Sequence, residues 1–276
     1  MRCVGRSMKS VKNSLKRPLV WRSLLSVTGC GKSPEKIAEM TNLLFDAITS
    51  GDVEQAKLYI KGGANVNAKK GEKGITPLIS SVQKNSNEMV ALLIKSKADI
   101  NILDANDRSP LIWALVTRRD YRQDSDLKKN TDILEQLIRE GADVNAKDKY
   151  DTVFGYAVGT RYSSILSLLI EAGADISILD KNTLSRALMV SATSGNKDLS
   201  ELFIKSGADV DARDASSGWT IIMNATLYKG TEGVIKLLIE SGADVNARSD
   251  GSTALDLART YGTKEVVEVL KAAGAK

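Results

Sequence analysis

Residues 237–247, with the sequence LLIESGADVNA, decide the fold of this chain. Val234, Leu237 and Leu238 have the i, i+3, i+4 spacing that marks the apolar face of a short helix. Gly242 follows this face and is suited to end the helix, because glycine adopts a left-handed backbone conformation without a steric penalty. Asn246 is expected to hydrogen-bond the local backbone in a turn. The stretch therefore predicts a helix that ends at a glycine and continues into a polar turn.

The same pattern occurs seven times along the chain. Taking the alanine after the glycine position as a marker, successive copies are 34, 44, 32, 34, 35 and 32 residues apart. Five of these six steps lie near the period of about 33 residues that is typical of a repeat made of a turn and two helices. In one copy Lys97 replaces the glycine. The markers are Ala64, Ala98, Ala142, Ala174, Ala208, Ala243 and Ala275.

A second motif predicts another helix before each of these. Residues 76–78 (TPL) and 109–111 (SPL) place a capping hydroxyl before a proline, which is favoured in the first turn of a helix because its missing N–H is not needed there. Thr220 and Thr253 open comparable segments without the proline. Each unit is therefore expected to contain two helices.

These two motifs closely resemble those of the ankyrin repeat family, over residues 36–276. The family signature T-P-L-H-x-A is represented at residues 76–78 and 109–111, and G-A-D-V-N-A is complete at residues 141–146 and 242–247. The resemblance implies an all-α solenoid of about seven helix–turn–helix repeats with β-turn finger loops.

The chain departs from the family in having no histidine. In the family, the signature histidine ties the loops of adjacent repeats, so the resemblance implies weaker coupling between repeats here. The residues at the histidine position are Ile79, Ile112, Met223 and Asp256.

Three segments of the array are atypical. The third repeat has extra length at residues 118–130, predicted as a solvated loop or a helix extension; it either contacts a partner or is a tolerated insertion. The fourth repeat opens with residues 152–157 (TVFGYA), and the fifth opens at 184–188 without a Thr-Pro start.

In the first repeat, helices are expected at 37–50 and 53–61, with residues 33–35 as the cap and first turn.

The net charge of +5 is concentrated in a basic leader. Residues 1–36 contain nine Lys or Arg and one acidic residue, so the remaining chain has 30 basic and 33 acidic residues. The repeats therefore lack the basic surface that phosphate binding requires, and we expect no nucleic-acid partner.

The leader, residues 1–35, leaves two interpretations open. Residues 25–30 (LSVTGC) resemble the lipobox of bacterial lipoproteins, which implies lipidation of Cys30 and a membrane-anchored protein of the bacterial cell envelope. Arg22 opposes this, because a charge within the apolar run costs about 2.5–3.5 kcal/mol on insertion. The alternative is a disordered basic tail on a cytoplasmic protein.

The composition argues against catalysis. Histidine is the commonest general base near neutral pH, and its absence removes Ser-His-Asp and Cys-His sites. The two cysteines, Cys3 and Cys30, precede the repeats and form no zinc-like cluster. Residues 26–33 resemble a P-loop only weakly, because its first glycine and preceding strand are missing. We expect no enzyme activity, no metal and no cofactor.

The sequence instead predicts a monomeric module that binds another protein. The family resemblance places partner contacts just before the Thr-Pro element and at the end of each first helix. Trp219 could equally fill the space between repeats, and Trp113 is expected in the core. The alternatives are a scaffold without a groove ligand and an accessory module of an enzyme on another chain. The candidate contact residues are Gln83, Lys84, Arg108, Val116, Thr117, Trp219, Leu227, Tyr228, Thr260 and Tyr261.

Overall fold

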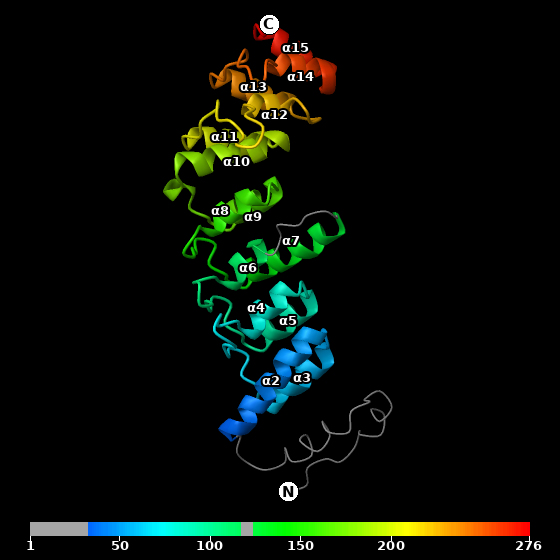
Figure 1. The fold of residues 1–276 in the computed structure, drawn as a ribbon, viewed down its shortest axis with the longest axis vertical. Coiled ribbons are helices and arrows are strands. Elements are labelled where there is room, and N and C mark those ends of the chain that lie inside the picture. Colours follow the sequence, from blue (N-terminus) through cyan, green and yellow to red (C-terminus); the bar gives the residue numbers. More distant parts are fainter. Residues whose placement is uncertain (1–32, 117–123) are drawn as a thin grey trace. The chain divides into compact units, whose positions relative to one another are not determined.

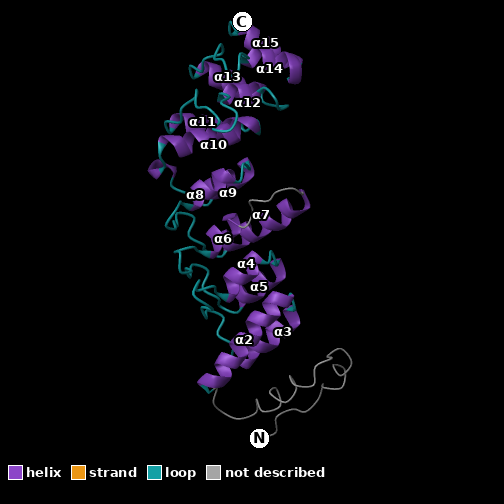
Figure 2. Cartoon of the chain, in the orientation of Figure 1, coloured by secondary structure: helices purple, strands orange, loops and turns teal. Residues whose placement is uncertain are grey.

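The computed structural model describes residues 33–116 and 124–276 (Figure 1). The leader up to residue 32, including Cys30, and the contact candidate Thr117 lie outside the described residues. The described elements are helices joined by turns (Figure 2), with β pairing limited in these ranges to isolated bridges such as Lys70–Ile75. None of the described helices has both the length and the apolar character needed to cross a membrane. The chain divides into two compact units, Met1–Asn65 and Val66–Lys276.

Within the described residues of the first unit, one pair of helices packs together, α2 (Pro34–Ser50) and α3 (Val53–Gly62). Ser33 caps α2 through its side-chain oxygen, which accepts the Lys36 N–H at 3.3 Å. Gly51 ends α2 with a φ of 74°. Both helices agree with the spans predicted from the sequence.

The second unit contains six further helix pairs within its described residues. The first helix of each pair contacts the first helix of the next, from α4 through α6, α8, α10 and α12 to α14. The pairs therefore stack in chain order, as the repeat period predicts (Figure 1). The pairs are α4 (Pro77–Gln83) with α5 (Asn87–Lys95), α6 (Pro110–Val116) with α7 (Asp124–Arg139), α8 (Val153–Gly159) with α9 (Ser163–Glu171), α10 (Lys181–Thr193) with α11 (Lys197–Lys205), α12 (Ile221–Ala225) with α13 (Glu232–Glu240), and α14 (Ala254–Tyr261) with α15 (Lys264–Ala272).

The residues at the family's histidine position take two different roles. Ile79, Ile112 and Met223 are fully buried, so an apolar side chain packs where the family has a polar one. Asp256 is exposed and caps its own helix, since its carboxylate accepts the Thr253 N–H at 2.9 Å. At three of these positions the side chain is therefore held by apolar packing.

Asparagine side chains join successive repeats along the turns. We predicted that Asn246 hydrogen-bonds its local backbone, but its Oδ1 accepts the Lys276 N–H of the last turn at 2.9 Å. Asp244 makes the local bond instead, accepting the Asn246 N–H. Asn101 and Asn145 reach the next repeat in the same way, accepting the N–H groups of Asp143 and Asp175. These bonds form a ladder between repeats.

The fifth repeat departs from this pattern. Helix α10 begins at Lys181, earlier than the opening predicted at 184–188, because Asp180 supplies a cap by accepting the Thr183 N–H at 2.7 Å. A 3-10 helix, η2 (Ile176–Ile178), precedes it. Ser177 occupies the ladder position but bonds within its own turn, and Ser185 of α10 accepts the Asp209 N–H instead.

The extra length of the third repeat lengthens its second helix. Helix α7 has 16 residues, against nine in α5 and α9. From Asp124 onward the predicted helix extension is therefore confirmed, whereas residues 117–123 lie outside the described part.

Candidate functional site

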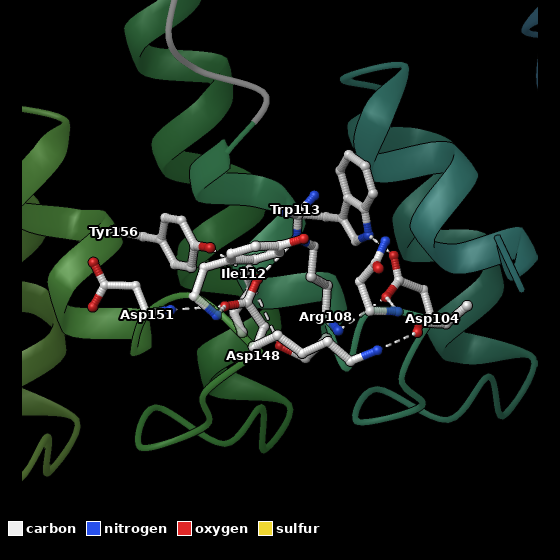
Figure 3. A network of polar contacts seen from close by, with 12 residues as sticks. Asp104, Arg108, Ile112, Trp113, Asp148, Asp151 and Tyr156 are labelled. Carbon is white, nitrogen blue, oxygen red and sulfur yellow. Dashed lines mark hydrogen bonds and ion pairs between the residues drawn. The ribbon is translucent and has the colours of Figure 1, made fainter.

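A buried carboxylate organises the finger loop of the third repeat. Asp104 Oδ1 accepts the N–H groups of Asn106 at 2.8 Å and Arg108 at 3.0 Å. Its Oδ2 accepts the indole N–H of Trp113 at 2.9 Å (Figure 3). The expectation of Trp113 in the core was wrong in part, because its ring is only half-buried and its N–H is fixed to the finger. An indole donor needs a partner where it is partly desolvated, and Asp104 supplies it.

A second carboxylate joins the third repeat to the fourth. The side chain of Asp148 is fully buried, and its Oδ2 accepts Arg108 Nε at 2.9 Å and the Tyr156 hydroxyl at 2.8 Å (Figure 3). Its Oδ1 accepts the backbone N–H groups of Tyr150 and Asp151. Every lone-pair direction of this carboxylate is therefore used, which a buried charge requires.

Two aromatic rings flank the paired guanidinium. Arg108 Cζ lies 5.3 Å from the centroid of the Trp113 ring and 5.4 Å from that of Tyr150. These distances are within the range of a cation–π interaction. The Arg108 side chain is 20% exposed, so this predicted partner contact is largely engaged inside the molecule. Tyr150 is 70% exposed and was not predicted.

Main-chain and lysine contacts connect three consecutive fingers. The Ala105 N–H donates to the Lys73 carbonyl at 3.0 Å, and Lys149 Nζ donates to the Ala105 carbonyl at 3.1 Å. The fingers of repeats two, three and four therefore support one another. We call Arg108, Trp113, Asp148, Tyr150 and Tyr156 the finger stack.

The electrostatics of the finger stack follow from its burial. Burial raises the pKa of the Asp148 carboxyl, but its hydrogen bonds outweigh that effect and hold the pKa below its ordinary value. The largest of these contributions come from the Asp151 N–H and the Arg108 guanidinium. Burial and the hydrogen bond to Asp148 raise the pKa of Tyr156 to about 12. The ionised aspartate and the neutral tyrosine are therefore the stable forms near neutral pH.

Two of the predicted contact residues are large exposed aromatics. Tyr228 and Tyr261 each lie eight residues after a capping threonine, Thr220 and Thr253, and they are 51% and 68% exposed. Tyr261 is the last residue of α14, whereas Tyr228 lies three residues beyond the end of α12. Because α12 and α14 contact each other, the two tyrosines lie at corresponding sequence positions of adjacent repeats.

The other predicted residues divide by exposure. Trp219 is half-buried, and its backbone carbonyl accepts the Asp214 N–H at 2.8 Å. Gln83, Lys84 and Thr260 are exposed, whereas Val116 and Leu227 are half-buried. Within the described ranges no group of three or more His, Cys, Asp or Glu side chains could hold a metal ion.

Comparisons with known proteins agree with this architecture. The family model for ankyrin repeats (3 copies) matches residues 44–122, 125–214 and 188–276. The chain is 30% identical over 246 residues to the nuclear factor NF-kappa-B p105 subunit of Gallus gallus, covering 85% of this chain and 23% of that protein. It is 29% identical over 151 residues to ankyrin repeat and SOCS box protein 6 of Homo sapiens, covering 52% and 34%. It therefore spans less than half the length of these curated relatives.

A solved structure shows the same fold. The crystal structure of the human ASB11 ankyrin repeat domain matches 83% of this chain and 96% of that domain, with a TM-score of 0.52. The sequence identity is 21%, so this likeness supports the fold and nothing about partners.

Proposed function

This chain belongs to the ankyrin repeat family, and on that premise we propose that residues 36–276 form a non-catalytic module that binds one protein partner. Ankyrin repeats are in general protein–protein interaction modules. The module presents the ends of its first helices and its finger loops, and its partner contacts lie on these two features.

The observation that carries this proposal is the pair Tyr228 and Tyr261. Both side chains are more than half exposed, although each is a large aromatic. Tyrosine supplies a large, rigid contact area at low cost in conformational entropy, and it is enriched among the residues that dominate binding energy. Because the fold buries neither ring, packing within the module does not account for these two aromatic residues, whereas contact with a partner does.

The remaining candidates extend the same surface. In the sequence, Arg108 and Trp219 precede the start of a first helix, and the other six lie at the end of a first helix or just after it. We expect all eight to form the periphery of the interface, which excludes water and contributes less binding energy than the two tyrosines. The six at the helix ends are Gln83, Lys84, Val116, Thr117, Leu227 and Thr260.

The test removes both anchors from the full chain. After a partner has been identified by affinity purification, we expect Tyr228→Ala with Tyr261→Ala to raise Kd at least about tenfold, because interface aromatics often contribute more than 1 kcal/mol each. The melting temperature should stay unchanged, since both rings are exposed.

The matched control is Ile178→Ala, which removes an equally exposed apolar side chain (62%) from η2, away from both tyrosines in the sequence. This variant should bind normally. An unaltered Kd in the double variant, or an equal loss in the control, contradicts the proposal.

The leader carries a separate prediction about location. Mass spectrometry of the native N-terminus decides between its two interpretations. A diacylated or triacylated Cys30 supports an envelope lipoprotein, in which the lipid is the membrane contact. An N-terminus at Met1 or Met8 supports the basic tail of a cytoplasmic protein.

A further inference from the structure

We propose that the outward face of Tyr150 binds a cationic side chain, arginine or lysine, of the protein partner. The Arg108 guanidinium lies between the rings of Trp113 and Tyr150, and the partner would place a second cation on the other face of Tyr150. This inference rests on the proposed interaction function and adds the chemistry of the group that is recognised.

Tyr150 is an exposed ring that is nevertheless held in place. Its backbone N–H donates to the buried Asp148 carboxylate at 2.8 Å, and its ring lies 5.4 Å from Arg108 Cζ. The side chain still has 70% of its surface exposed. A ring that is ordered before binding loses little conformational entropy when a partner covers it.

The chemistry of the ring favours a cation. The face of an aromatic ring is the negative part of its quadrupole, and it attracts ammonium and guanidinium groups within ~6 Å of the centroid. The Arg108 charge behind Tyr150 does not oppose a second cation strongly, because Asp148 lies 2.9 Å from its Nε and is fully buried. The paired guanidinium thus orders the ring while the aspartate offsets its charge.

The charges of the two fingers do not by themselves select the partner group. Residues 102–108 and 146–151 contain four aspartates and three basic residues, a formal net charge of −1. Arg108 is paired with the buried Asp148, and the exposed charged side chains are those of Asp107, Lys147 and Lys149. The preference for a cation therefore comes from the face of the aromatic ring.

Tyr150 differs in this respect from the other exposed tyrosines. Among the described residues, the cation–π contacts are those of Arg108 with Trp113 and Tyr150, and none involves Tyr228 or Tyr261. The latter two rings are exposed as well. The proposal therefore applies to the finger stack and not to exposed aromatics in general.

The experiment selects ligands instead of assuming one. A phage library of random twelve-residue peptides is selected on the full-length protein, and the enriched peptides are measured against the Tyr150→Ala protein. Peptides that lose affinity for this variant are Tyr150-dependent. In these peptides each Arg or Lys is then replaced by Gln.

Three variants at the same position separate a cation–π contact from simple apolar burial. Tyr150→Phe keeps the ring and should keep the affinity, Tyr150→Trp should increase it, and Tyr150→Leu should reduce it about fivefold, the size expected for an exposed cation–π contact of ~1 kcal/mol. Because the Tyr150 side chain is exposed, we expect all three variants to keep the melting temperature of the unchanged protein.

The outcomes distinguish this inference from the proposed function. Tyr150-dependent peptides that require an Arg or Lys, with the ranking Trp, Phe, Leu, support it. Tyr150-dependent peptides that share an acidic or aromatic residue instead, or that bind the Leu variant equally well, overturn it. Peptides that depend on Tyr228 and Tyr261 but never on Tyr150 overturn it and leave the proposed function in place. No enrichment of specific peptides counts against both.

Discussion

The fingers of repeats three and four and the turns of repeats five and six both hold one repeat against the next, by different means. The first pair uses side-chain charge, through Arg108 and the buried Asp148. The second uses backbone approach: a Cβ atom added at Gly195, whose φ is 71°, would lie 2.5 Å from the Gly230 carbonyl oxygen. A single repeat fold therefore accommodates two kinds of coupling within one unit.

The difference indicates which kind of substitution would destabilise each region. Coupling by charge depends on protonation and on the partners of one carboxylate, whereas coupling by backbone approach depends on the absence of a side chain. In a stack of repeats the stability is roughly a sum of repeat and interface contributions, so each junction can be weakened by itself. Four predictions test this comparison.

The largest expected effect is that of Asp148→Ala. The change leaves the Arg108 guanidinium and the Tyr156 hydroxyl without their acceptor in a mostly buried place, and we expect a loss of about 3 kcal/mol in the free energy of unfolding. Denaturant titration measures it. Asp214→Ala is the matched control, because Asp214 bonds mainly within its own finger and its ion pair with Arg161, at 3.7 Å, involves an exposed guanidinium. Equal losses would show that the bonds of Asp148 across two repeats stabilise the fold no more than the bonds of an aspartate within one finger.

The second effect is that of Gly195→Ala. Here a side chain would both occupy a left-handed backbone position and meet the Gly230 carbonyl, so we expect a loss of about 2 kcal/mol. Gly173→Ala is the control, since Gly173 has a φ of 89° and nothing lies within 4 Å of its added Cβ. It should cost only about 1 kcal/mol, from the backbone alone. Thermal unfolding of both variants checks the difference, and identical melting temperatures would argue against close approach as the cause.

The third effect is that of Tyr156→Phe, which removes a hydrogen bond to a carboxylate and should cost about 1.5 kcal/mol. The pKa of Tyr156 is raised to about 12, so its contribution is complete below about pH 10 and is lost as the pH rises through 12. The pKa of Asp148 is lowered, so its contribution is present above the ordinary aspartate pKa of about 4 and is lost in more acidic solution.

Melting temperature against pH tests this third prediction. The Phe variant should show a flatter decline between pH 10 and 12 and should keep the acid decline. A parallel decline in both proteins at alkaline pH would show that Tyr156 does not titrate as expected.

The smallest effect concerns the ladder. Asn145→Ala removes two exposed bonds to the next repeat, including the one from the Asp175 N–H, and should cost about 1 kcal/mol. Ser185→Ala should cost a similar amount, because it removes the acceptor of the Asp209 N–H. Ser177→Ala should cost clearly less, since Ser177 bonds only within its own turn. A larger loss for Ser177 than for Ser185 would restore the regular ladder as the better description.

Much of the fold could be predicted because it depends on short-range patterns. The helix starts at Pro34, Pro77 and Pro110 follow from a capping hydroxyl and a proline, and the end at Gly51 follows from a residue that tolerates positive φ. The start of α10 was missed because Asp180 caps as well as threonine does, and an aspartate at that place is not part of the expected motif.

The candidate site was predicted only in part. The positions of Tyr228 and Tyr261 follow from the repeat, since both lie eight residues after a capping threonine, at the end of a short helix or just beyond it. The bond between Arg108 and Asp148 spans 40 residues and has no local signal. An aspartate shortly before the helix cap in repeats three and four was the one hint available.

The sequence by itself determined the repeat, the helix pairs and their caps, because periodicity, capping and glycine conformations act over a few residues. Only the tertiary structure decided three contacts. Asp148 is buried against Arg108, the Trp113 indole donates to Asp104 of the finger, and the exposed Tyr150 ring lies against the paired Arg108 guanidinium. These contacts exist because stacking brings loops of different repeats together. A charge buried there must be paired and hydrogen-bonded to offset its desolvation, so Asp148 lies against Arg108.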